Sequence, residues 1–418
     1  MEKYENPFSF PPDFLWGAAT SSHQVEGNNI HNDWWEWETT GRLKEPSGMA
    51  CDHWNRFRED FQLAKSLSHN AHRFSIEWSR VEPEEGCFDE KAISHYKEVI
   101  ASLRSNRLLP IVTLYHFTLP LWLAKQGGWL CPRAPRLFAR FAERMAKELG
   151  QEVDTWVTLN EPEVYVCKSY LMGDWPPGIK SYKKCVQAMF RLLKAHTLAY
   201  HAIKNTLGRG PSTRIGIAKG VVVFIPCRAR SATDKVVIQI RDFFFNHFFV
   251  KAAIRSLDFI GLNYYSRNFI RSGRFGLPAI FGDICDPAHH PEAGNKNSLG
   301  WEIWPEGIYQ IVKAFSRYKR PILITENGIC TNHDEERLQF IEEHLRALKK
   351  AMDEEAPVIG YLYWSLLDNF EWAEGFSPRF GLIEVDYKTQ ERKIRPSALR
   401  FAQICKSGFI SLSSSTAL

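Results

Sequence analysis

Short apolar runs alternate with longer segments of helical period along nearly the whole chain, and this alternation most constrains the fold. The runs are compact, as expected for parallel strands buried on both faces. They lie at residues 14–19, 71–76, 108–115, 155–159, 215–223, 259–263, 322–325 and 358–364. Segments with helical spacing lie between and after them, at residues 55–69, 90–106, 134–149, 183–206, 233–253, 305–317, 334–353 and 396–406. Eight strand–helix pairs predict an α/β fold, a single closed (β/α)8 TIM barrel.

An open, doubly wound sheet is the alternative fold for such a pattern. The chain contains no GxGxxG motif and no P-loop that would favour it. A length of 418 residues suggests two or three domains, but α/β barrels of this size form around one core. We therefore predict one domain over residues 1–406, followed by a flexible polar tail at residues 407–418.

Charge and cysteine usage exclude several classes of partner. The 53 basic residues are dispersed among 48 acidic ones, so we expect no nucleic-acid binding. No stretch of about 18 uncharged apolar residues occurs, so we expect no membrane span and a cytoplasmic location. The nine cysteines are odd in number and widely spaced, which predicts reduced, mostly buried thiols. There is no HExxH motif and no Cys/His pair at ligand spacing, so neither a metal nor a cofactor is expected.

Polar side chains stand where the predicted strands end. In a (β/α)8 barrel these ends meet at one face, where the chemistry is built. Two of the residues are carboxylates that follow apolar runs, Glu161 and Glu326. Two buried carboxylates at one site can divide into a protonated acid and an ionised nucleophile, which is the apparatus for cleaving a glycosidic bond. The other residues at the strand ends are Arg73, His116, Asn160, Asn263, Tyr265, Asn327 and Trp364.

The motifs Thr158-Leu159-Asn160-Glu161-Pro162 and Ile324-Thr325-Glu326-Asn327-Gly328 resemble the acid/base and nucleophile signatures of one family, the retaining β-glycosidases of glycoside hydrolase family 1. The resemblance extends in order from residue 14 to about residue 397. Its other segments are Phe14–Thr20 with Gln24 and Glu26-Gly27, Arg73–Ser75, Leu114–His116, Gly261–Tyr265 and Trp364–Trp372.

This resemblance implies roles for individual residues. Glu326 would attack the anomeric carbon, while Glu161 would protonate the leaving oxygen and later deprotonate water, so that configuration is retained. Arg73 and Tyr265 would keep Glu326 ionised, and Asn160 would bind the sugar 2-hydroxyl. The remaining substrate-binding residues would be Gln24, His116, Asn263, Tyr265, Trp364, Glu371 and Trp372.

The resemblance also implies a substrate class. Relatives that act on 6-phosphorylated sugars tend to have a small polar residue where this chain has Glu371, so we expect non-phosphorylated β-glucosides, with β-galactosides and β-fucosides tolerated. His116 is followed by Phe117 and Thr118, where the glucosidases commonly have Trp and Asp, which leaves glycone preference open. Two alternatives are a non-catalytic carbohydrate-binding barrel and a transglycosylase, which passes the sugar to an acceptor sugar instead of water. Retention of Glu161 favours O-glycosides over thioglucosides.

The chain departs from the family pattern between strands five and six, where the connection is shorter than usual. The deletion predicts a thinner helical layer and exposed apolar side chains at Phe244, Phe248 and Phe249. We expect this face to be a homodimer contact or a second ligand site.

Overall fold

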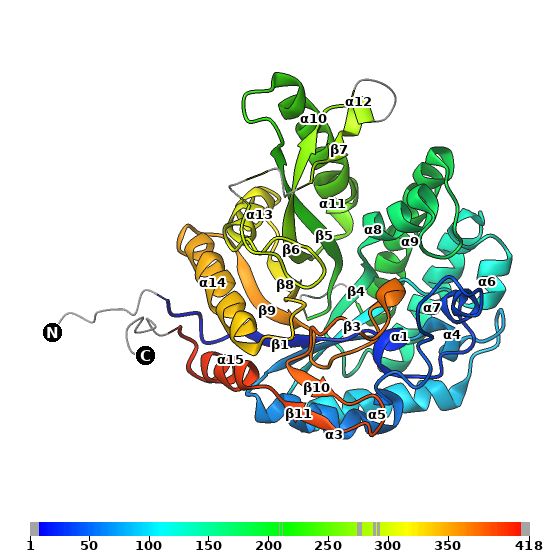
Figure 1. The fold of residues 1–418 in the computed structure, drawn as a ribbon. Helices are drawn as coiled ribbons and strands as arrows, with labels where there is room; N and C mark the ends of the chain where they lie inside the picture. Colours follow the sequence, from blue (N-terminus) through cyan, green and yellow to red (C-terminus); the bar gives the residue numbers. More distant parts are fainter. Residues whose placement is uncertain are drawn as a thin grey trace.

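Eight parallel strands close into a barrel in the computed structural model, which confirms the predicted fold class (Figure 1). The structure describes residues 8–208, 210, 212–273, 278–286, 290 and 293–410. The strands follow the order β5-β4-β3-β2-β1-β9-β8-β6, and pairing of β5 with β6 completes the circle. Their bounds are β1 Leu15–Ala19, β2 Ala71–Ser75, β3 Leu109–Tyr115, β4 Thr155–Asn160, β5 Arg214–Pro226, β6 Phe259–Arg271, β8 Ile322–Asn327 and β9 Val358–Trp364.

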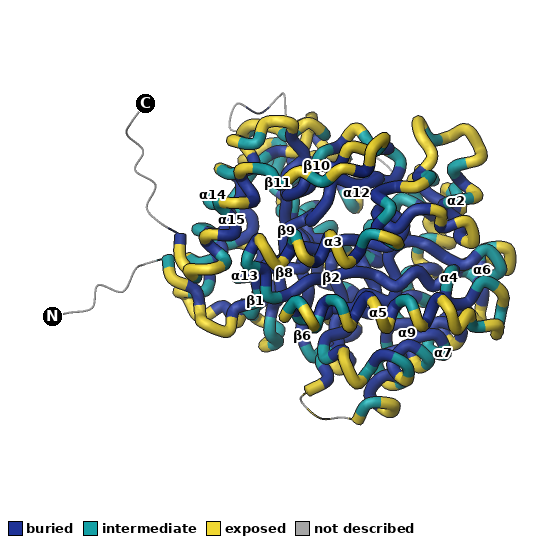
Figure 2. Tube along the Cα trace, turned by 90° about the horizontal axis from the view of Figure 1, so that it is seen from below, coloured by how far each residue is buried: buried dark blue, intermediate teal, exposed yellow. Residues whose placement is uncertain are grey.

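Amphipathic helices surround the barrel and bury their apolar faces against it, so the strands lie in the buried interior in Figure 2. The segments predicted at 134–149 and 334–353 coincide with α7 and α14. The principal outer helices are α3 His53–Ser66, α5 Glu90–Ser105, α7 Ala134–Leu149, α9 Tyr182–Leu207, α13 Glu306–Ser316, α14 Asp334–Asp353 and α15 Pro396–Ser407. Short helices lie in the loops, among them α1 Ser22–Val25, α2 Asp33–Glu38, α4 Trp78–Val81, α6 Leu121–Lys125 and α8 Pro162–Val166.

Strand alternation sets which side chains enter the barrel. Ala71 and Ile111 belong to an apolar cluster inside it. Because strand side chains alternate between the two faces, Arg73 and Thr113, two residues further on, point into the same interior nearer the carboxyl ends. Their side chains meet there, with Arg73 Nε 3.0 Å from Thr113 Oγ1.

Strands β5 and β6 are longer than predicted, with 13 residues each, and they carry a substructure beyond the barrel. They stay paired as far as Pro226 and Ile270. The outer halves of these strands, together with α10 (Ala232–Asp242), α12 (Pro278–Phe281) and β7 (Asp283–Ile284), form what we call the β5–β6 arm, which projects from the barrel in Figure 1. The arm has its own small core of Phe224, Val237 and Ile270.

A disulfide joins Cys227 to Cys285 in the arm, so the prediction of reduced thiols is wrong for this pair. The backbone N–H of Cys227 donates to Ile270 O, and that of Cys285 donates to Phe269 O. Strand β6 therefore holds together two cysteines that are 58 residues apart, which their spacing in the sequence conceals. His290 lies beside them, and its ring nitrogen and the two sulfurs lie within 4.8 Å of one another. This is the composition of a metal site, but the two sulfurs are bonded to each other.

The predicted helix 233–253 is divided into α10, a π-helical turn η3 (Phe243–His247) and α11 (Phe248–Ala253). Asn246 in the turn donates to Val222 O at 2.7 Å and accepts from Val222 N at 3.1 Å. The register between β5 and β6 shifts at this point, between Val221 and Val223. The amide of Asn246 thus satisfies backbone groups of Val222, and the inserted turn places it there.

The apolar face predicted beside strands five and six is present in part. Phe244 is 47% exposed, and Phe243 and Phe190 are also exposed. Phe248 is half-buried against Phe190, with ring centres 5.8 Å apart. Phe249 is buried against His196 of α9, so the prediction of its exposure is wrong.

Two features complete the fold near its ends. A short antiparallel hairpin, β10 Ile383–Val385 and β11 Arg392–Ile394, was not predicted because its strands are only three residues long. Residues 407–410 of the predicted tail pack on the barrel: Phe10 N donates to Gly408 O, and Ile410 is buried. Residues 411–418 of that tail lie outside the described residues. Among the described helices, none is both long and apolar enough to cross a bilayer.

Candidate active site

The two predicted carboxylates lie at the carboxyl ends of β4 and β8, and one amide on β6 connects them. Glu161 follows the last residue of β4, and Glu326 lies within β8. Asn263 is the strand neighbour of Glu326, and its Nδ2 donates to Glu161 Oε1 at 2.8 Å. The barrel therefore brings both carboxyls to one place.

The backbone conformation of Glu161 determines the direction of its side chain. Its φ of +42° is in the left-handed region, which is uncommon for a residue with a side chain. Its N–H donates to Ala218 O on the neighbouring strand β5 at 2.7 Å, which holds the turn between β4 and α8. Such conformations cost of order 1–3 kcal/mol and cluster at functional sites.

Glu326 has strong hydrogen-bond donors on both of its oxygens. Arg73 Nη1 donates to Oε1 at 2.5 Å, and the Tyr265 hydroxyl donates to Oε2 at 2.8 Å. Burial raises the pKa of Glu326, whereas Arg73, Tyr265 and Asn263 all act to lower it. These donors stabilise the carboxylate form.

Glu161 has a different environment. Burial and the charge of Glu326 raise its pKa to about 8. Its carboxyl accepts from a neutral amide, that of Asn263, where Glu326 accepts from a guanidinium. When two close carboxyls share one proton, the proton goes to the one with weaker donors. These surroundings favour the proton on Glu161 and the negative charge on Glu326 at neutral pH.

A hydrogen-bond network orients the polar groups around this pair. Asn160 Oδ1 accepts from Arg73 at 2.7 Å and from Asn263 at 3.1 Å, which directs the Asn160 Nδ2 towards His116 Nε2 at 3.2 Å. Burial, with a further contribution from the charge of Arg73, holds the pKa of His116 well below its usual range, so the imidazole is neutral. With Nε2 accepting, the proton lies on Nδ1, and Nδ1 has no partner among the described residues. The ring can therefore donate to a ligand.

The residues predicted to hold the sugar ring also come together. Gln24 is buried in α1 and donates to Glu371 Oε2 at 3.2 Å and to Phe370 O at 2.9 Å. Burial and the charges of Glu326 and Glu161 raise the pKa of Glu371 to about 8, so this carboxyl belongs to the same site. The aromatic residues of the site also lie together: the His116 ring is nearly parallel to those of Trp364 and Trp372, with ring centres 5.9 and 6.2 Å away.

The loop that carries Glu371 and Trp372 is held by a buried carboxylate. Asp368 accepts from Gly381 N at 2.8 Å and forms ion pairs with Arg379 and Arg395. These contacts connect the loop after β9 to the β10–β11 hairpin. The loop is therefore fixed before a substrate arrives.

Sequence reasoning assigned no role to several residues that support the site, although Thr325 and Asn369 lie within the motifs quoted above. Thr113 holds Arg73, Thr325 donates to Asn263 Oδ1 at 2.6 Å, and Asn369 accepts from Gln24 at 3.0 Å. Each lies in a strand or loop near a predicted site residue, but its residue type and position in the sequence do not indicate the contact that it makes. Lys219 also received no role, although a charged residue inside the apolar run of β5 is visible in the sequence and marks the position as unusual.

A separate surface cavity of about 530 Å³ contains none of these residues. It is lined by residues that include Trp54, Arg80, His95 and Asp89. The Trp54 ring is stacked on the His95 ring, with ring centres 3.6 Å apart, and Arg80 Cζ lies over the Trp54 ring, 4.0 Å from its centre. Because the aromatic face is occupied by the protein's own side chains, this cavity is not the candidate site.

Two carboxyls with unequal surroundings, brought together where the strands of a closed barrel end, are the pair that cleavage of a glycosidic bond uses. The sequence model of Glycosyl hydrolase family 1 matches residues 6–256 and 251–409, and the chain belongs to this family. It is accordingly a β-glycosidase, and the retaining mechanism is general in the family. This result confirms the family and enzyme class predicted from the motifs.

Known relatives match almost the entire chain. Beta-glucosidase A of Thermotoga maritima is 32% identical over 96% of this chain and 98% of its own length. A beta-galactosidase of Pyrococcus woesei is 30% identical, over 92% of this chain and 94% of its own length.

Solved structures agree with the fold. A beta-glycosidase from Pyrococcus horikoshii superimposes with a TM-score of 0.91 at 42% identity, covering 97% of this chain and 96% of that one. Beta-glucosidase from Thermotoga maritima in complex with glucoimidazole has a TM-score of 0.88 at 32% identity, covering 96% of this chain and 100% of that one. These relatives are enzymes, which favours catalysis over the alternative of a non-catalytic binding barrel.

Proposed function

We propose that the chain hydrolyses non-phosphorylated β-glucosides, and also β-galactosides and β-fucosides, with Glu326 as nucleophile and Glu161 as acid/base. The observation that carries this assignment is the inequality of the two carboxyls. Glu326 accepts from Arg73 and Tyr265, whereas Glu161 has an amide donor and a pKa of about 8.

The reaction proceeds in two displacements. A Glu326 oxygen attacks the anomeric carbon while Glu161 transfers its proton to the departing oxygen, giving a glycosyl ester on Glu326 and a free alcohol. Glu161, now ionised, takes a proton from water as that water attacks the same carbon and releases Glu326. Two inversions at one carbon retain the β configuration.

Several groups are available to bind the glycone. We assign hydroxyl contacts to Gln24, His116, Asn160, Asn263 and Glu371, and apolar contact with the sugar ring to Trp364 and Trp372. The neutral imidazole of His116 presents Nδ1–H as a donor. Asn160 has a second amide hydrogen beyond the one directed to His116, and this hydrogen is suited to the sugar 2-hydroxyl, a contact that strengthens as the oxocarbenium ion develops.

Charge disfavours a phosphorylated substrate. Glu161, Glu326 and Glu371 contribute three carboxyls to one site. The charge of Glu326 raises the pKa of Glu161, and the charges of Glu326 and Glu161 raise that of Glu371, so the site already resists a second negative charge beside the Glu326 anion. The Arg73 guanidinium is already bound to Glu326 and Asn160. A phosphate needs cations that are free to pair with it, so we expect plain glycosides to be preferred. The relatives named beta-glucosidase and beta-galactosidase agree with a neutral hexose.

A panel of p-nitrophenyl glycosides tests the substrate class. It comprises the β-glucoside, β-galactoside, β-fucoside, β-mannoside and 6-phospho-β-glucoside, and the β-glucoside should give the largest kcat/KM. Faster turnover of the 6-phospho-β-glucoside than of the β-glucoside would contradict the proposal. Proton NMR of the first product should show the β-anomer, and product analysis with a concentrated acceptor alcohol separates hydrolysis from transglycosylation.

Two variants separate the roles of the carboxyls. Glu326→Ala with added azide should give the α-glycosyl azide, because azide replaces the missing nucleophile on the opposite face. Glu161→Ala with azide should instead give the β-glycosyl azide, since azide then attacks the glycosyl-enzyme. Exchange of these two products between the variants would reverse the assignment.

Two sequence predictions stay predictions. A cytoplasmic location is one, and the disulfide in the arm is more typical of oxidising compartments. The other is a homodimer contact or second ligand at the face of Phe244, which light scattering and native mass spectrometry test.

A further inference from the structure

A buried ion pair lies beside the acid/base carboxyl, and the mechanism above does not use it. Lys219 on β5 and Glu163 on α8 place Nζ and Oε2 2.9 Å apart, with side chains 0% and 1% exposed. The Lys219 Nζ also donates to Gly220 O at 2.7 Å and lies 4.9 Å from the ring centre of Phe245. The pair is thus enclosed between β5, α8 and the η3 turn.

The backbone of β5 connects this pair to Glu161. Ala218 O accepts the N–H of Glu161. A Cβ atom on Gly220 would lie 3.1 Å from the carboxyl carbon of Glu161, so the carboxyl packs directly on the Gly220 backbone. Strand side chains alternate, and Ala218 faces the barrel interior, so Lys219 points to the other face of β5. The ammonium and the Glu161 carboxyl therefore flank the same short stretch of strand.

Stability alone gives no reason to keep such a pair. Removing two charges from water is unfavourable, and apolar side chains of similar volume often serve a buried position equally well or better. Lys219 lies in a strand whose neighbouring residues are small or apolar, where a hydrophobic side chain is the ordinary choice. A role at the neighbouring Glu161 would explain why the Lys219–Glu163 pair is present.

We infer that Lys219 and Glu163 are a positioning pair for the acid/base residue: Lys219 favours ionised Glu161, and Glu163 limits that effect, so that Glu161 serves as acid in one step and as base in the next. The inference rests on the assignment of Glu161 under the proposed function. Lys219 lowers the pKa of Glu161, against the larger effects of burial and Glu326, which raise it. Glu163 balances the ammonium, so the net field at Glu161 is that of an ion pair and not of a lone cation.

Other groups act on Glu161 or on the pair, and the variants below leave them all unchanged. Differences between the variants therefore report the pair itself. These groups are Glu326, Arg73, Asn263, Tyr265 and Glu371 around Glu161, and the Cys167 thiol near Glu163.

The test is the pH dependence of kcat/KM for p-nitrophenyl β-glucoside, whose alkaline limb reports loss of the acid proton in the free enzyme. Glu163→Gln leaves Lys219 uncompensated, so the alkaline limb should move to lower pH by about 0.5–1 unit. Lys219→Met should move it to higher pH by about the same amount. Burial raises the pKa of Glu163, so without Lys219 this carboxyl takes up a proton and adds no new charge. A purely structural role predicts no such opposite shifts.

Three further variants make the result decisive. Lys204→Met removes a matched buried lysine, paired with Asp258 at 2.9 Å at the amino end of β6, and should leave the limb in place. Glu161→Gln should abolish the limb; if the limb persists there, the proposed function fails and not only this inference. The double variant Lys219→Met/Glu163→Gln should follow Lys219→Met, and it decides the question if a single variant does not fold. Unchanged limbs, or shifts in the same direction, in variants that fold would overturn the inference.

Discussion

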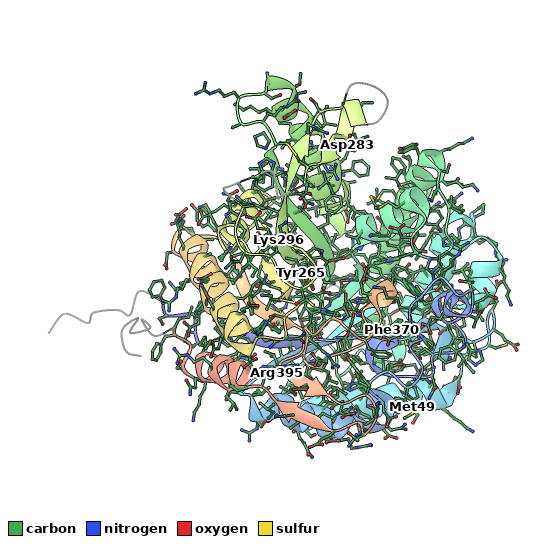
Figure 3. All side chains as sticks on the ribbon, in the orientation of Figure 1. Met49, Tyr265, Asp283, Lys296, Phe370 and Arg395 are labelled. Atoms are coloured by element: carbon green, nitrogen blue, oxygen red, sulfur yellow. A yellow bond between two sulfur atoms is a disulfide. The ribbon has the colours of Figure 1, made fainter. Side chains whose placement is uncertain are left out.

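Ion pairs at the centre of the barrel are enclosed on all sides, whereas an ion pair of the β5–β6 arm reaches the surface. At the centre, Arg73, Lys219 and Glu326 are buried, and their contacts favour particular protonation states. In the arm, the ion pair joins the buried Asp234 to Arg228, whose side chain is 54% exposed. Figure 3 shows the separation, with Tyr265 over the barrel and Asp283 out on the arm.

The difference indicates what each region is selected for. Buried charges at the centre reduce stability and set up chemistry. The arm has a small core and a covalent link between Cys227 and Cys285, as small substructures commonly do. Changes at the centre should therefore alter activity strongly, whereas changes in the arm should alter local stability.

The largest effect is expected for Glu326→Ala. Removing the proposed nucleophile should lower kcat for p-nitrophenyl β-glucoside by about 10⁴-fold or more, because the glycosyl ester of the proposed mechanism cannot then form. The variant also leaves the buried Arg73 guanidinium without its carboxylate partner, so the folded state should lose about 3–5 kcal/mol of stability. The measurement is steady-state kinetics together with thermal unfolding. Activity within tenfold of wild type, in a variant that unfolds cooperatively, would show that the catalytic centre lies elsewhere.

Arg73 should follow in size. Arg73→Met removes the cation bound to Glu326 and Asn160, so kcat/KM should fall by about 10²–10³-fold. The acid limb of the pH profile should move to higher pH, because Glu326 loses the guanidinium that lowers its pKa. Arg73→Lys is the control, because lysine keeps the positive charge but cannot donate to Glu326 and Asn160 in the same geometry. The acid limb of this variant should return towards its wild-type pH, whereas kcat/KM should stay low. A limb that stays in place in Arg73→Met would contradict this role.

Much of this centre was predictable, and the reason is local. Parallel barrel strands are apolar runs, so polar residues at the end of a run stand out, as Asn160-Glu161 do after 155–159 and His116 does after 108–115. Carboxyl ends of parallel strands meet at one face, so those residues converge without further information.

The arm was less predictable because its contacts are not local. The outer half of β6, Tyr264–Arg271, mixes polar and apolar residues and is only partly buried, so it does not stand out as an apolar run. The outer half of β5 is apolar as far as Ile225, but nothing in its sequence indicates that it stays paired with β6 there. Cys227 and Cys285 meet across β6. Lys219 and Glu163 show the same limit at the centre, since only the folded barrel reveals that the two charges are partners.

A smaller effect is expected on stability from Glu161→Gln, and its dependence on pH is distinctive. The pKa of Glu161 is about 8 in the folded protein, against an ordinary value of 4.5. Between these values the folded state keeps a proton that the unfolded state has lost, so folding becomes less favourable as pH rises. Glutamine does not titrate, so the variant should gain about 2–4 kcal/mol relative to wild type by pH 8 and little near pH 5.

Thermal unfolding at pH 5 and pH 8 measures this gain. Glu354→Gln, at an exposed carboxyl, is the control and should not show a gain that increases with pH. A gain for Glu161→Gln that falls from pH 5 to pH 8 would mean that the proton is on another carboxyl.

The arm should give the smallest effect on activity. The double variant Cys227→Ser/Cys285→Ser should keep kcat/KM within about twofold, because the disulfide contacts none of the site residues, while the arm loses about 2–4 kcal/mol of local stability. Limited proteolysis and hydrogen exchange should show earlier opening of α10 and β7, with Cys87→Ser, at an exposed free thiol, as the unchanged control.

Alkylation of the denatured, unreduced wild type should label seven cysteines. Labelling of all nine would restore the prediction of free thiols, and a large loss of activity in the double variant would show that the arm and the barrel centre are coupled.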